Sequence, residues 1–129
     1  MFSSSIGRKL VMAVTGVSLI AFLVVHCAIN ACVFFMDGGA TFNAAAEFMA
    51  HNLFIRLAEV GLIGGLLIHI LQGLSLTFDN MKKRNNKYGS SPSRSNSTWY
   101  SRSMGLLGTI LLLFLIMHLK HFWIVSRFD

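Results

Sequence analysis

Three long apolar runs constrain this chain more than any other feature of its sequence. They extend from Leu10 to Met36, from Leu53 to Phe78 and from Met104 to about Val125. Each run reaches the roughly 20 residues that a helix needs to cross about 30 Å of hydrocarbon, and none reads as a strand. Hydrophobic residues make up 54% of the 129 residues and charged residues only 12%, which excludes an ordinary soluble domain. The sequence therefore predicts an all-α membrane protein.

We expect one domain over residues 1–129 with three transmembrane helices. The predicted helices span about 8–36, 53–79 and 101–125. The first run is longer than the roughly 7–15 apolar residues of a signal peptide, which favours a retained helix. The polar segment at about 80–100 holds the only proline and predicts a loop, whereas 36–48 has a Gly-Gly turn and then an alanine-rich stretch. That stretch predicts a short helix along the outer surface.

The net charge of +6 is segregated by loop. Arg8 and Lys9 precede the first run, and the segment 37–52 has no Lys or Arg. Most of the other cations lie between the second and third runs: Lys82, Lys83, Arg84, Lys87, Arg94 and Arg102. Because cytoplasmic loops are rich in Lys and Arg, this pattern predicts a cytoplasmic N-terminus and a cytoplasmic second loop. Topology explains the charge, so we expect no nucleic-acid partner.

Three of the five histidines, one in each apolar run, lie clearly within the runs. The rise of a helix places His26 about 24 Å, His118 about 21 Å and His69 about 14 Å from the cytoplasmic end of its run. Facing imidazoles at a common depth suit a haem with an axial ligand on each side, and His26 and His118 form one such pair. Hydrogen bonds between helices are the alternative role. We interpret His121 as an interfacial polar residue and His51 as a solvated one.

His69 lies in a stripe of small residues. Gly61, Gly65, His69 and Gly73 recur every four residues, so the glycines lie on the histidine's face of the helix. A haem plane standing against a helix needs this absence of side chains, and we favour that interpretation. Close approach of a second helix is the alternative. The chain offers His69 no partner at its own depth.

The three histidine-bearing segments resemble a known family. "AVTGVSLIAFLVVHCAIN", "LLIHILQGLSLTFDN" and "STWYSRSMGLLGTILLLFLIMHLKHFW" are similar to the dihaem cytochrome b membrane subunit of bacterial succinate dehydrogenases and quinol:fumarate reductases. The similarity covers nearly the whole chain, and the histidines occur in the family's order. The family subunit has five membrane helices, whereas this sequence ends at Asp129 after three. We therefore expect either a fragment or a bundle that another polypeptide completes.

The resemblance implies two b-type haems. His26 and His118 would bind the haem distal from the iron–sulfur subunit, and His69 would bind the proximal haem with a histidine from a fourth helix. Haem propionates are anionic and need donors near the cytoplasmic ends. The expected donors, each of which is also a candidate lipid-headgroup contact, are Arg8, Lys9, Ser101 and Arg102.

The resemblance also implies partners and a location. A flavoprotein and an iron–sulfur protein would dock on the cytoplasmic face of a multi-pass protein of the bacterial cytoplasmic membrane. The chain would be a non-catalytic electron-transfer subunit that passes electrons to or from a quinone, expected to be menaquinone. A haem subunit of another quinone-linked enzyme and a haem-free membrane anchor are the alternatives. Toward the outer side, Glu59 is expected to pair with Arg56, which leaves Glu47 as the better candidate for moving protons at a quinone.

Overall fold

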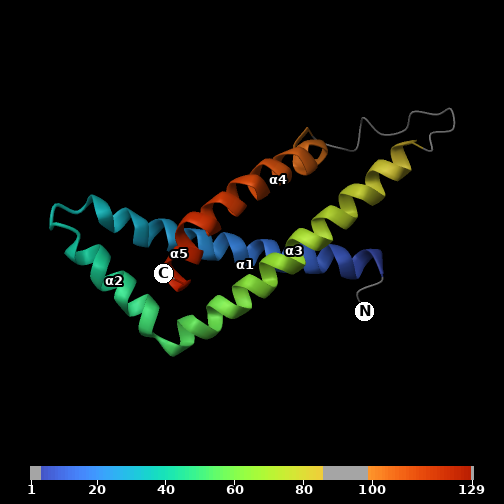
Figure 1. Ribbon diagram of the computed structural model, residues 1–129. Coiled ribbons are helices and arrows are strands. Elements are labelled where there is room, and N and C mark those ends of the chain that lie inside the picture. The colour runs from blue at the N-terminus through green and yellow to red at the C-terminus, as the bar shows by residue number, and fades with distance from the viewer. Residues whose placement is uncertain (1–3, 86–98, 129) are drawn as a thin grey trace. The chain divides into compact units, whose positions relative to one another are not determined.

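The computed structural model describes residues 4–85 and 99–128, which are almost entirely helical (Figure 1). The elements are α1 (Ser5–Ala31), a 3₁₀ turn (Cys32–Phe34), α2 (Ala40–His51), α3 (Leu53–Asn85), α4 (Trp99–His118), a π-helical segment (Leu119–Ile124) and α5 (Val125–Phe128). No strand occurs within the described ranges. The predicted all-α class is confirmed.

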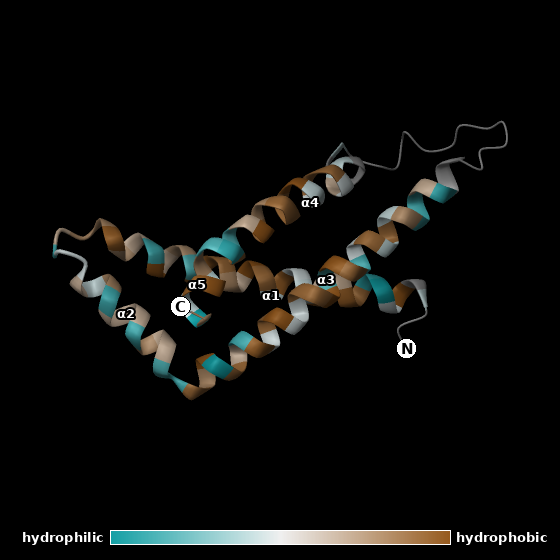
Figure 2. Ribbon diagram, viewed as in Figure 1, coloured by the Kyte–Doolittle hydropathy of each residue, from teal (hydrophilic) through white to brown (hydrophobic). Residues whose placement is uncertain are grey.

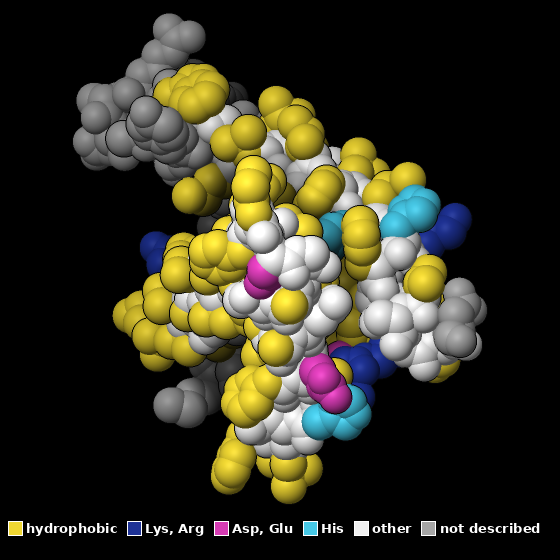
Figure 3. Space-filling model, turned by 90° about the vertical axis from the view of Figure 1, so that its left-hand side faces the viewer, with side chains coloured by type: hydrophobic (Ala, Val, Ile, Leu, Met, Phe, Trp, Pro, Cys, Tyr) yellow, Lys and Arg dark blue, Asp and Glu magenta, His cyan; other side chains and the backbone are white. Residues whose placement is uncertain are grey.

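Three stretches of helix are long and apolar enough to cross a membrane. They are Ile6–Phe34, Leu53–Lys82 and Ser103–Phe128. No described residue is buried inside the chain, and large apolar side chains along all three stretches are exposed. Figure 2 shows hydrophobic residues along α1, α3 and α4, and Figure 3 shows hydrophobic side chains over much of the face in view. Such surfaces suit lipid or other helices. The prediction of three helices of membrane-spanning length is confirmed.

The chain has two compact units that meet within α3. The first unit, Met1–Gln72, contains α1, α2 and the first part of α3. The second unit, Gly73–Asp129, contains the end of α3 together with α4 and α5. In the second unit a Cβ added to Gly105 would lie 3.2 Å from Cγ2 of Thr77. A glycine at this position therefore lets α4 approach the end of α3.

The first helix begins three residues before its expected start. The backbone N–H of Gly7 donates to the side-chain oxygen of Ser4 over 3.0 Å, which caps α1. At the other end, regular α-helix stops at Ala31 and the 3₁₀ turn continues to Phe34. Such tightened turns satisfy carbonyl groups that the end of an α-helix leaves open.

The second long helix continues past residue 79 to Asn85. Residues 80–85 include Met, Lys and Arg, which favour helices in water as well as in lipid. The polarity that predicts a loop at 80–100 therefore does not end the helix at the edge of the apolar run. The remainder of that predicted loop, 86–98, lies outside the described residues.

The alanine-rich segment forms the predicted short helix, α2. Gly38 and Gly39, with φ of 67° and 87°, make a left-handed turn that favours glycine. The Asp37 carboxylate then accepts from the backbone N–H of Gly39 over 3.0 Å and from that of Thr41 over 2.8 Å. Hydrogen bonds from Thr41, first from its side chain and then from its backbone, lower the pKa of Asp37. The charged carboxylate therefore stabilises the first turn of α2.

This cap makes the start of α2 sensitive to acid. Since folding lowers the pKa of Asp37, its contribution is complete above about pH 4 and is lost as pH falls through the lowered pKa. We expect the Thr41 amide proton shift to titrate with a midpoint below that of a free aspartate. An NMR titration in micelles measures it, with Asp37→Asn as the control that abolishes the step. A midpoint at or above the ordinary value contradicts the cap.

Candidate functional site

His69 is held against α1 within the first unit. Its Nδ1 lies 2.9 Å from the hydroxyl oxygen of Thr15, a residue 54 positions earlier in the chain. Its Cε1 lies 3.4 Å from the place that a Cβ on Gly16 would take. The ring therefore packs beside two consecutive residues of α1 and is half-buried. A side chain longer than alanine at Gly16 would compete with the ring for space.

The hydrogen bonds at Thr15 decide which nitrogen of His69 carries the proton. The Thr15 hydroxyl lies 2.7 Å from the carbonyl oxygen of Val11, and a carbonyl can only accept. The single hydroxyl proton is therefore donated to Val11, and the Thr15 oxygen accepts from His69. In the neutral imidazole one nitrogen donates and the other has a lone pair. The geometry at Thr15 therefore favours the Nδ1–H tautomer of His69, which leaves the lone pair on Nε2. Nε2 has no hydrogen-bond partner among the described residues.

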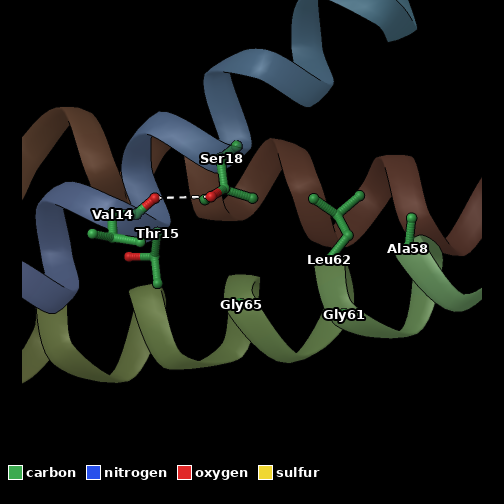
Figure 4. A pocket seen from close by; sticks show the side chains of 8 residues that line it. Val14, Thr15, Ser18, Ala58, Gly61, Leu62 and Gly65 are labelled. Atoms are coloured by element: carbon green, nitrogen blue, oxygen red, sulfur yellow. Dashed lines mark hydrogen bonds between the residues drawn. The ribbon is translucent and has the colours of Figure 1, made fainter.

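A groove lies beside this contact, between α1 and the first part of α3 (Figure 4). Its volume is about 270 Å³, and its lining includes Thr15, Ser18 and Leu19 of α1 and Gly61, Leu62 and Gly65 of α3. A Cβ added to Gly61 or Gly65 would meet nothing within 4 Å. Within the described part of the chain, these two glycines therefore border open space rather than a tightly packed helix.

His26 lies on the same helix as Thr15 but at another level. The rise of an α-helix places His26 roughly 16 Å further along α1 than Thr15. Because Thr15 contacts His69, His26 does not lie at the level of His69. Its ring stacks on that of Phe22, with centroids 5.3 Å apart and planes at 27°. The stack is a contact between residues one turn apart, which restricts the orientation of the imidazole.

His118 has a closely similar setting in the second unit. It stacks on Phe114 at 5.3 Å and 21°, and its centroid lies 5.0 Å from that of Phe122. The segments 22–26 and 114–118 both read Phe-Leu, then two apolar residues, then His. The sequence prediction missed this repeated pattern, although it is visible in the sequence. Because His26 and His118 belong to different units, their pairing stays a prediction.

The two remaining histidines bond to their own helices. Nδ1 of His51 lies 3.0 Å from the carbonyl oxygen of Glu47, and Nδ1 of His121 lies 2.8 Å from that of Met117. Both histidines are exposed. These local bonds fit the expected roles of His51 and His121 as polar surface residues.

The carboxylates of Glu47 and Glu59 differ in their contacts. Arg56 Nη1 donates to Glu59 Oε2 over 2.9 Å, which confirms the expected ion pair. Glu47 is exposed on α2, and no ion pair of its carboxylate occurs among the described residues. A role for Glu47 in proton transfer stays a hypothesis.

The expected propionate donors lie near the starts of two helices. Arg8 and Lys9 are in the first two turns of α1, and Arg8 is the less exposed of the two. Ser101 and Arg102 are in the first turn of α4, but their side chains lie outside the described part of the structure. Their role at a haem stays a prediction.

The described residues do not form a metal-ion site built from several side chains. Within residues 4–85 and 99–128, no three His, Cys, Asp or Glu side chains gather as they do around a metal ion. A bis-histidine haem needs one imidazole on each side of the macrocycle and does not depend on such a cluster.

Comparisons of the chain with protein-family models, with curated proteins and with solved structures give no match.

Proposed function

We propose that this chain is the haem b electron-transfer subunit of a succinate:quinone oxidoreductase in the bacterial cytoplasmic membrane. The observation that carries the proposal is the environment of His69. Thr15 binds one ring nitrogen, the other has a lone pair with no partner among the described residues, and glycines border an open groove nearby. A histidine in an apolar helix is costly, and this arrangement gives it a use as a ligand.

The residues present fit a haem in two respects. Histidines that bind a metal commonly donate the other ring N–H to a protein acceptor, as His69 does to Thr15. The second respect is open space: a groove of about 270 Å³, slightly smaller than the roughly 300–1,000 Å³ of small-molecule sites, includes Gly65 and Gly61, which are about one and two turns from His69. His69 is not itself part of the lining. In the proposal the α1 and α3 walls hold one edge of the macrocycle, and further helices cover the remainder.

The other histidines supply the remaining ligands of the proposal. His26 and His118 bind the distal haem from α1 and α4, each oriented by a stacked phenylalanine. His69 binds the proximal haem, whose opposite ligand comes from outside these 129 residues. Haem, when bound, supplies a one-electron carrier between the iron–sulfur subunit and the quinone. Two histidine ligands leave no open iron position, which suits electron transfer.

Cations at the cytoplasmic ends complete the proposal. Arg8 and Lys9 of α1, with Ser101 and Arg102 of α4, bind the propionates. The basic second loop faces the flavoprotein and iron–sulfur partners.

A haem-free membrane anchor is the second candidate, and one observation favours it. The Thr15–His69 hydrogen bond itself ties α1 to α3, as a purely structural histidine would. That role explains the Nδ1 contact. It does not explain the open groove beside Gly61 and Gly65 or the two phenylalanine-stacked histidines on α1 and α4.

Substrate-driven reduction tests the proposal. The full chain is tagged, purified from its native membranes in mild detergent, and examined by absorption spectroscopy. We expect a flavoprotein and an iron–sulfur protein to copurify, and succinate to produce the sharp bands of reduced haem b. Reduction by formate or hydrogen instead identifies another quinone-linked enzyme. A preparation without b-type bands under dithionite supports the haem-free anchor.

A further inference from the structure

We infer that Thr15 is a positioning residue: its hydroxyl sets the tautomer of His69 and the strength of its Nε2 as a haem ligand. The inference rests on the proposed function and deepens it. It assigns a role to a residue of α1 for a haem whose ligand lies on α3.

The hydroxyl of Thr15 already donates its proton within α1, to the preceding turn of the helix. It donates to the carbonyl of Val11 at 2.7 Å, with the carbonyl of Met12 further away at 3.3 Å. Threonine is branched at Cβ, and within a helix its hydroxyl has few rotamers, which the bond to the preceding turn stabilises. The oxygen therefore presents a lone pair to Nδ1 of His69. A tautomer with the proton on Nε2 would leave two acceptors facing each other.

A second threonine provides a matched comparison. Thr109 lies on α4, and its hydroxyl donates to the carbonyl of Gly105 over 2.8 Å. It has the same kind of backbone bond as Thr15, but it does not line the groove and has no bond to His69. Thr109→Val therefore makes the same chemical change in another helix without touching the imidazole.

Loss of the Thr15 hydroxyl has a predictable chemical effect. A hydrogen bond from Nδ1–H makes Nε2 a stronger electron donor, which stabilises the oxidised iron. Thr15→Val keeps the shape of the side chain and removes the acceptor. We expect haem affinity at His69 to fall on the order of 10–100-fold. The midpoint potential of any haem retained there rises, and Thr15→Ser restores both properties.

Three variants of the full chain, Thr15→Val, Thr15→Ser and Thr109→Val, are purified with their native partners. Haem content and potentiometric titration form the first arm. Nitrogen NMR of His69 in haem-depleted protein forms the second. We expect Nδ1 to carry the proton in the unaltered chain, in Thr15→Ser and in Thr109→Val, and Nε2 to gain proton occupancy in Thr15→Val.

The two arms separate failure of this inference from failure of the proposed function. If Thr15→Val keeps the haem content, the potential and the His69 tautomer of the unaltered chain, Thr15 has no positioning role. A loss of haem that Thr109→Val matches, or that Thr15→Ser does not restore, also overturns the inference. If the unaltered protein binds no haem, the proposed function fails, while the NMR arm still decides whether Thr15 sets the tautomer.

Discussion

Replacing His26 or His118 with alanine is expected to remove one and the same haem. The two histidines lie about 24 Å and 21 Å along their apolar runs, and a bis-histidine haem needs one imidazole on each side. Either change therefore removes an axial ligand of a single cofactor. Spectroelectrochemistry of the purified protein should show that both variants lose almost the full amplitude of the same redox component. The component that depends on His69 should remain.

His121→Ala is the matched control for these variants. It removes a histidine one turn beyond His118, where the ring is exposed and its Nδ1 is bonded to Met117. Both redox components should survive this change. If His26→Ala and His118→Ala lose different components, the two histidines do not share a haem. If neither loses a component, they are not haem ligands.

The second large effect is expected at the glycine groove. Gly65→Leu should weaken haem binding at His69 although the ligand remains. A Cβ at this position meets nothing within 4 Å, so the leucine side chain enters the space that the macrocycle would occupy. Overpacking of about 1–3 kcal/mol corresponds to binding weaker on the order of tenfold or more. Haem quantification and redox titration measure the loss of this component against the His26 and His118 component.

Gly64→Leu is the matched control. Gly64 is the residue before Gly65 on α3 and also has nothing within 4 Å of an added Cβ, but it does not line the groove. We expect it to leave both haems in place. If Gly65→Leu removes the His26 and His118 haem as well, the glycines serve helix packing throughout the bundle. Equal haem loss from the Gly64 and Gly65 variants would likewise show that the glycines serve helix packing rather than haem binding.

The length of the apolar runs was enough to predict three long helices, but not where those helices end. A transmembrane helix needs about 20 apolar residues, and hydropathy detects that requirement directly. The ends depend on local bonds and propensities instead. The Ser4 hydroxyl caps α1 before residue 8, and Lys82, Lys83 and Arg84 continue α3 into the polar region. From composition alone, such polar residues are predicted to form a loop.

The candidate site was predictable in its histidines and not in its supporting residues. His69 stands out because an imidazole is unusual in an apolar run. Thr15 does not stand out, since its contact with His69 depends on the register of two helices joined by α2. A different register would place another residue of α1 against the ring. The phenylalanines four residues before His26 and His118 were within reach of sequence analysis, because residues at this spacing meet on a helix.

The central claim is that histidines of this chain bind haem b, and the ratio of haem to protein tests it most directly. The absorbance of the pyridine haemochrome in alkaline solution, with protein measured by amino-acid analysis, gives this ratio for the native complex and for the 129 residues alone. The account predicts two haems in the complex and one or fewer on the chain alone, since it proposes that the ligand opposite His69 comes from another helix. Two stable bis-histidine haems on the chain alone contradict the missing ligand, and a native complex without haem contradicts the central claim.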